Sequence, residues 1–133
     1  MDGPENALVA AVIARLKADP AVSALVGARV WDQPAEDADF PQLLVGRSES
    51  RPVDADGGGV EQVLTLSGVS RFEGAEEARA IAAAVRACLH HAPLEPAGLR
   101  LVSLRVVYVD VFRGADHRRT YAVIRLRAVT EQL

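Results

Sequence analysis

The chain has 133 residues, of which 50% are hydrophobic and 25% charged, and this composition indicates one ordinary globular domain over residues 1–133. A formal net charge of −3 and a pI near 5.6 argue against a typical nucleic-acid-binding protein, which is usually basic. The apolar run near the N-terminus, residues 7–14, is too short to cross a bilayer. We therefore expect no membrane partner and a protein made in the cytoplasm.

The charge is distributed unevenly along the chain. Residues 1–61 carry eleven acids and five bases, a net charge of −6, whereas residues 62–133 carry seven acids and ten bases, a net charge of +3. Head-to-tail assembly of identical subunits would bring an acidic surface against a basic one.

Two helices are predicted before the first strand. Asn6 is a plausible N-cap for a helix that runs to about Ala18. Pro20, after Asp19, starts a second, short helix, and Gly27 ends it. The sequence ARVWD then predicts a short strand.

Hydrophobic periodicity predicts the remaining elements. The pattern gives strands at 42–50 and 60–71, the second of them central, a helix from Gly74 to about His90, and two late strands at 99–112 and 119–130. Runs of strands separated by helices, with hairpins available, indicate an α+β fold. We expect a mainly antiparallel sheet with two main helices packed on one face and a long C-terminal β-hairpin.

The late hairpin is unusually long. A strand of about twelve residues at ~3.3 Å each reaches nearly 40 Å, so we expect the hairpin to extend past the helices that cover it. Strict alternation places Val102, Leu104, Val106 and Tyr108 on one face and Leu101, Val107, Val109 and Val111 on the other, with Arg105, Arg125 and Arg127 interleaved. Apolar residues on both faces suggest a partner, which we infer is another copy of the chain.

The order of several segments resembles a family of small tail-completion proteins of phages, prophages and gene transfer agents. The matching pieces are residues 19–30 ending in LVGARV, Phe40-Pro41 before a strand, the Gly/Asp segment 54–59, Thr65-Leu66, and helix residues 77–89. The resemblance covers nearly the whole chain and depends on the order and spacing of these pieces.

The resemblance implies a tail terminator. Such a protein forms a ring, a hexamer in the family, that ends the tail tube at the head-tail junction of a phage-like particle. Its implied partners are further copies of itself, the tail tube protein, the head-tail connector or stopper protein, and DNA that passes through the lumen without sequence-specific binding. The particle would be assembled in the bacterial cytoplasm.

Enzymatic and metal sites are weakly indicated. Cys88, His90 and His91 do not share one helix face, and a structural zinc site needs four ligands. Asp54 and Asp56 lack the later ligands of a calcium loop. Asp37 and Asp39 have no His or Lys partner nearby in the sequence, and the common catalytic motifs are missing. We expect neither an enzyme nor a cofactor.

Other residues are candidates for contact with a subunit or connector. The predicted hairpin tip carries Arg113, His117, Arg118 and Arg119, which suit a solvated turn, an acidic patch of a neighbour or DNA phosphates. Trp31 suits either the core or an interface. With these, the predicted interface comprises Trp31, Asp54, Asp56, Arg105, Val109, Val111, Arg113, His117, Arg118, Arg119, Arg125 and Arg127.

Two alternatives to a terminator stay open at this point. One is a different neck or minor tail component, and the other is a generic α+β domain that binds proteins or nucleic acid. A ring or incorporation into tails would distinguish the terminator from the generic domain.

Overall fold

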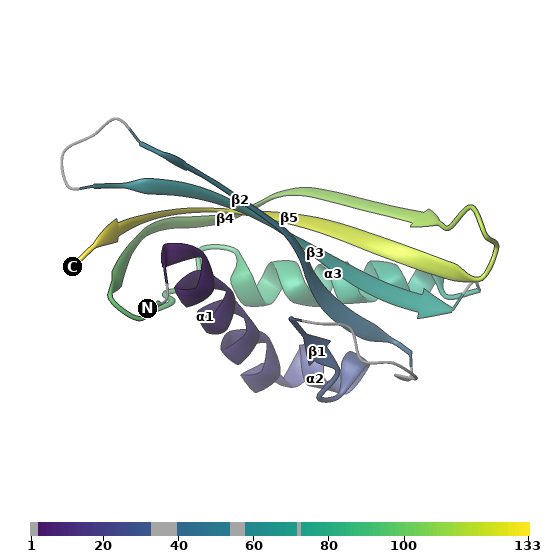
Figure 1. Ribbon diagram of the computed structural model, residues 1–133. Coiled ribbons are helices and arrows are strands. Elements are labelled where there is room, and N and C mark those ends of the chain that lie inside the picture. Colours follow the sequence, from purple (N-terminus) through teal and green to yellow (C-terminus); the bar gives the residue numbers. More distant parts are fainter. Residues whose placement is uncertain (1–2, 33–39, 54–57, 72) are drawn as a thin grey trace.

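The computed structural model describes residues 3–32, 40–53, 58–71 and 73–133. Figure 1 shows a layer of helices beneath a long, twisted sheet. The elements are α1 (Pro4–Ala18), α2 (Pro20–Val26), β1 (Val30–Trp31), β2 (Gln42–Pro52), β3 (Val60–Arg71), α3 (Ala75–Leu89), β4 (Leu99–Arg113) and β5 (Arg119–Gln132).

The first two helices meet at Asp19. This residue ends α1, and its Oδ2 accepts a 3.0 Å hydrogen bond from the N–H of Val22 at the start of α2. Gly27 ends α2 with a positive φ of 61°, as the sequence predicts. The predicted cap at Asn6 is wrong: α1 starts at Pro4, because proline suits a first turn that needs no N–H donor.

The sheet confirms the predicted α+β class. Its strand order is β1-β2-β3-β5-β4, with β1 parallel to β2 and every other neighbouring pair antiparallel. Strand β3 lies between β2 and β5, which confirms its predicted central position. Strands β2 and β4 therefore lie toward opposite margins of the sheet, and each has one side that the sheet leaves largely unpaired.

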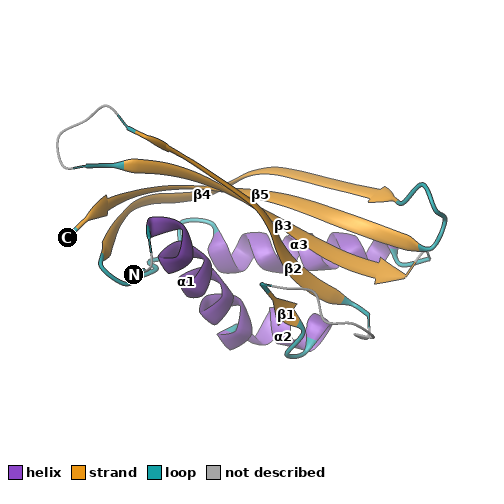
Figure 2. Ribbon diagram, in the orientation of Figure 1, coloured by secondary structure: helices purple, strands orange, loops and turns teal. Residues whose placement is uncertain are grey.

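All three helices cover the same face of the sheet (Figure 2). The buried core lies between the two layers and includes Leu66, Ile81 and Ile124. Helix α3 comes so close to β3 that a Cβ added at Gly68 would lie 2.9 Å from Cγ2 of Ile81. The other face, here called the open face, carries no helix.

The turn of the late hairpin lies near the start of α3. His117 lines a hollow of about 840 Å³ together with residues around the first turn of α3, including Glu76 and Glu77. The ends of β2 and β3, in contrast, reach past α1 (Figure 1). None of the helices in the described ranges is both long and apolar enough to span a bilayer.

Candidate assembly surface

Strand β4 is the longest strand and forms one margin of the sheet. Four of its side chains are large, apolar and exposed: Val102 (53%), Val107 (44%), Tyr108 (44%) and Phe112 (43%). Among the described residues, only the terminal Leu133 shares this property. Exposed apolar residues that gather on one strand mark that strand as an interaction surface.

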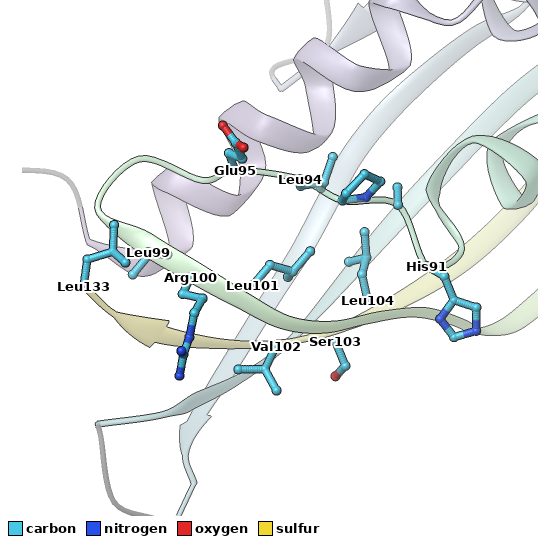
Figure 3. Close-up of a pocket in the computed structure, with 12 residues that line it drawn as sticks. His91, Leu94, Glu95, Leu99, Arg100, Leu101, Val102, Ser103, Leu104 and Leu133 are labelled. Carbon is cyan, nitrogen blue, oxygen red and sulfur yellow. The ribbon is translucent and has the colours of Figure 1, made fainter.

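Two β-bulges change the faces that alternation predicts for β4. The pairing with β5 shifts between Leu101 and Ser103 and again between Val106 and Tyr108. Each bulge adds a residue and resets the alternation. Figure 3 shows the result at the first bulge, where Leu101 and Leu104 point to one side of the strand and Val102 and Ser103 to the other.

With these bulges, part of the apolar surface of β4 faces the helices. Five of them pack on the core there: Leu101, Leu104, Val106, Val109 and Val111. Strict alternation is therefore wrong in placing Leu104 and Val106 on the same face as Val102 and Tyr108. The open face receives Tyr108 and Phe112 instead, whose cross-strand partners are Arg125 and Tyr121.

The middle of β4's outer edge is covered by the residues that follow α3. The N–H of His91 donates a 2.9 Å hydrogen bond to the carbonyl oxygen of Leu104. The N–H of Val106 donates a 3.0 Å hydrogen bond to Nδ1 of His90. The backbone groups of Leu104 and Val106 thus point away from β5 and have partners in their own chain.

Past the second bulge, the outer edge of β4 is open. Backbone N–H and C=O groups alternate in direction along an antiparallel strand. After the bulge, those of Val109, Val111 and Arg113 therefore point away from β5. The bond from the N–H of Gly114 to the carbonyl of Arg119 agrees with this alternation. Among the described residues, no backbone hydrogen bond reaches the outward groups of Val109 and Val111.

Strand β2 offers a second open edge at the other margin. Strand β1 pairs only with Leu43 and Leu44, and a bulge follows between Val45 and Ser48. The N–H of Leu43 points outward to the carbonyl of Arg29 at 2.9 Å. In the β2–β3 register, the backbone groups of Ser48, Ser50 and Pro52 also point away from β3. Pro52 loses no sheet bond by lacking an N–H, since that position faces away from β3.

The open face contains more guanidinium groups than carboxylates near β5. Glu61 binds both Arg127, at 2.7 Å, and Arg51, at 2.8 Å. The hydrogen bond from Arg127, and secondarily that from Arg51, lowers the pKa of Glu61. Arg105 lies directly opposite Arg127 in the register, and it forms no ion pair with any described carboxylate.

Aromatic rings accompany these arginines. The guanidinium of Arg125 lies 4.8 Å from the centroid of the Tyr108 ring, and Phe112 stacks on Tyr121 with centroids 5.6 Å apart. Tyrosine and arginine are the residue types enriched at the energetic centres of interfaces.

The structure brings together part of the predicted interface. Arg105, Arg125 and Arg127 share the open face, and Val109 and Val111 contribute outward backbone to the margin beside it. Trp31 lies on β1 at the other margin, half-buried, where its Nε1 donates to Oε1 of Gln42 at 3.0 Å. Asp54 and Asp56 lie outside the described residues.

The tip residues make contacts within their own chain. The N–H of Arg118 donates to Oδ1 of Asp116 at 3.0 Å, and the guanidinium of Arg119 lies 5.1 Å from the centroid of the Phe40 ring. Arg113 and His117 also have interaction partners. The tip therefore belongs to the same end of the molecule as β4's open segment.

The predicted interface omits four contributors to this surface, although three of them, Val102, Val107 and Tyr108, belong to the apolar run that suggested a partner. Val102, Val107, Tyr108 and Phe112 are exposed, and the first bulge moves Leu104 and Val106 to the helix face. His90 covers the edge of β4, and His91 beside it has a positive φ of 60°. A mixed run such as VSLRVVYVDVFR gives no signal for the position of a bulge.

The described residues contain no group of three or more His, Cys, Asp or Glu placed to hold a metal ion. Cys88 is buried, and its Sγ lies 3.8 Å from the carbonyl oxygen of Arg15. Burial, and then the charge of Asp19, raise the pKa of this thiol. Such a thiol packs as a small apolar side chain.

Comparison with known proteins supplies the family. The model of the tail completion protein gp17 family matches residues 10–131. The chain belongs to this family. As a tail completion protein, it is a structural component of a phage-like tail.

Solved structures agree with this membership. A chain from the virion of a native gene transfer agent (GTA) particle is 30% identical to this tail completion protein and aligns with a TM-score of 0.87. The alignment covers 95% of this chain and 96% of that chain. Among curated proteins, none matches the chain.

Proposed function

We propose that this tail completion protein is a tail terminator. Copies of the chain join head to tail in a ring, of six copies as the family resemblance implies, that ends the tail tube of a phage, prophage or gene transfer agent particle. The ring contacts the tube protein on one side and the head connector or stopper on the other, and DNA passes through its lumen.

One observation carries this proposal: in a single copy, β4 leaves uncovered the part of its outer edge past the second bulge and four large apolar side chains. Natural proteins cover, shorten or charge such an edge, because it pairs readily with another chain. A heterologous contact between different surfaces of identical copies generates a ring when its rotation closes. In a closed ring, the open β4 edge of every copy is therefore covered by a neighbouring copy.

The neighbouring surfaces support the same role. The split in charge between residues 1–61 and 62–133 favours head-to-tail contacts over contacts between like surfaces. The similar GTA chain comes from an assembled virion, and the alignment covers nearly all of both chains. The proposal extends that setting to this chain.

The test is to delete this chain in a strain that produces the particles, and to measure the length of the tails and their attachment to heads by negative-stain microscopy. A terminator predicts tails that lack a defined end or are not joined to heads, and recovery when the intact chain is supplied. Joined tails of normal length in the absence of the chain would contradict the proposal.

A further inference from the structure

We propose that neighbouring copies join by antiparallel pairing of two sheet edges: residues 109–113 of β4 in one copy and residues 48–52 of β2 in the next. This inference rests on the proposed function and identifies the contact that joins ring neighbours. The result is one sheet that continues from copy to copy.

The directions of the strands fit this contact. Strand β2 is antiparallel to β3, β3 to β5 and β5 to β4, so β2 and β4 run in opposite directions within one copy. When two copies keep the same orientation, β4 of the first therefore meets β2 of the second as an antiparallel pair. Repeating one rotation then uses one β4 edge and one β2 edge of each copy.

The two open segments also match in length. On β4, the open segment begins after the bulge at Val106/Tyr108 and ends with the strand at Arg113. On β2, it begins after the bulge at Val45/Ser48 and ends with the strand at Pro52. Beyond these limits, His90 covers β4 and β1 covers β2.

Only every second residue of each edge strand points its N–H and C=O groups outward, so the possible registers differ from one another by two residues. Outward residues of one strand must face outward residues of the other, because only these can exchange N–H and C=O groups. One allowed register places Val111 opposite Ser50, and with it Arg113 opposite Ser48 and Val109 opposite Pro52. This register uses the whole of both open segments; at its end the carbonyl of Pro52 accepts from the N–H of Val109, and Pro52 donates no bond in return.

Charge selects the same register. With Val111 opposite Ser50, Asp110 lies opposite Arg51 of the next copy, and both side chains are on the open face. A shift of two residues in one direction would place Asp110 opposite Glu49, a like-charge pair. A shift in the other direction would leave Val109 beyond the end of β2. Opposite charges that fix a register are a usual device of specific interfaces.

The test is a disulfide cross-link in assembled particles. In the proposed register Phe112 faces Glu49 of the next copy at a pair without mutual backbone bonds, where Cα atoms lie about 4.5 Å apart, a separation a disulfide can span. Both side chains are exposed in a single copy, so the fold tolerates the change. The variant carries Phe112→Cys and Glu49→Cys, with Cys88→Ala to remove the native thiol.

Mild oxidation should give a ladder of covalent multimers larger than dimers on a non-reducing gel. We expect at least about ten-fold more product than from the comparator pair Phe112→Cys with Arg47→Cys, whose separation is outside disulfide range in the proposed register. Dimers from Phe112→Cys alone would show that two β4 edges meet each other and would overturn the inference. An absence of product from the main pair, or more product from the comparator, would also overturn it.

Charge reversal gives a second readout without cysteines. Asp110→Arg should lower the number of normal-length tails about ten-fold or more, since it places like charges at the contact, and Arg51→Asp in the same chain should restore them. No loss, or a loss without recovery, would count against the register. Joined tails of normal length with no cross-link would overturn this inference and leave the terminator intact, whereas tails that form normally without the chain would refute the terminator itself.

Discussion

The Nδ1 atom of His90 lies 3.0 Å from the backbone nitrogen of Val106 and accepts its hydrogen bond. An imidazole thus occupies the place on β4's edge that a partner strand would otherwise take. The adjacent bond from His91 to Leu104 extends this cover. A single chain therefore protects the middle of its edge strand, while among the described residues no backbone hydrogen bond reaches the outward groups of Val109 and Val111.

We predict that this contact makes stability depend on pH. Partial desolvation of the ring, followed by the charges of His91, Arg105 and Arg86, lowers the pKa of His90 below its usual value of 6.5. The folded state therefore favours neutral His90, and its contribution to stability is present above pH 6.5 and is lost as the pH falls through the lowered pKa. Urea unfolding should show a lower midpoint at pH 5.5 than at pH 7.5.

Variants of His90 and of His91 show which of the two residues causes the pH dependence of stability. His90→Ala should lose stability at pH 7.5 and show a smaller further loss at pH 5.5, because its edge bond is already missing. His91→Asn keeps a residue type that tolerates a positive φ and should retain most of the pH dependence. An unchanged pH dependence in His90→Ala would show that the contact is not the sensor.

A second prediction concerns the outward N–H of Val111. Val111→Pro removes a donor that makes no bond in the single chain, so it should unfold only slightly earlier than Val111→Ala. Asp110→Pro removes a donor directed at β5 and should cost about 1–3 kcal/mol. Val111→Pro should nevertheless prevent tail termination while Val111→Ala permits it, as counted by microscopy. Equal behaviour of the two variants in particles would mean that this edge is not used.

The third prediction concerns the close approach of α3 to β3. A Cβ at position 68 would lie 2.9 Å from Cγ2 of Ile81, so Gly68→Ala should destabilise the fold by about 1–3 kcal/mol. In an Ile81→Ala background that methyl group is gone, and the same substitution should cost less. Thermal or urea unfolding of the four proteins in this cycle measures the difference. Additive effects would show that the two residues do not compete for space.

A fourth prediction concerns acid stability. Hydrogen bonds from Arg127 and Arg51 lower the pKa of Glu61 below its usual value of 4.5, so its contribution is present above pH 4.5 and is lost as the pH falls through the lowered value. Glu61→Gln should reduce stability at pH 7 and flatten the acid unfolding curve. Glu95→Gln, at an exposed loop position, is the control. Identical acid unfolding of wild type and Glu61→Gln would contradict the role given to this carboxylate.

Much of the fold could be predicted because its signals are local. Pro20 and Gly27 mark the limits of α2, and the apolar stripe through Ile81 and Leu89 identifies α3. The central position of β3 agrees with its buried residues, such as Leu64 and Leu66. The start of α1 at Pro4 was missed because proline at the first position favours a helix as strongly as an Asn cap.

The assembly surface could be predicted only in outline. The length of the late hairpin and its arginines indicated a partner, but the faces depended on bulges near Val102 and Val107 that no turn residue marks. The strand order, which puts β4 at the margin and β5 inside, depends on pairings between distant segments. Neither property is encoded in local periodicity, and so neither could be obtained from the sequence.

The most direct test of the central claim is an electron cryomicroscopy reconstruction of the head-tail junction in particles that contain this chain. The account predicts a closed ring of copies at the end of the tail tube, in which residues 109–113 of each copy lie beside residues 48–52 of the next. A junction in which β4's outer edge faces solvent, or in which this chain occupies no ring, would contradict it.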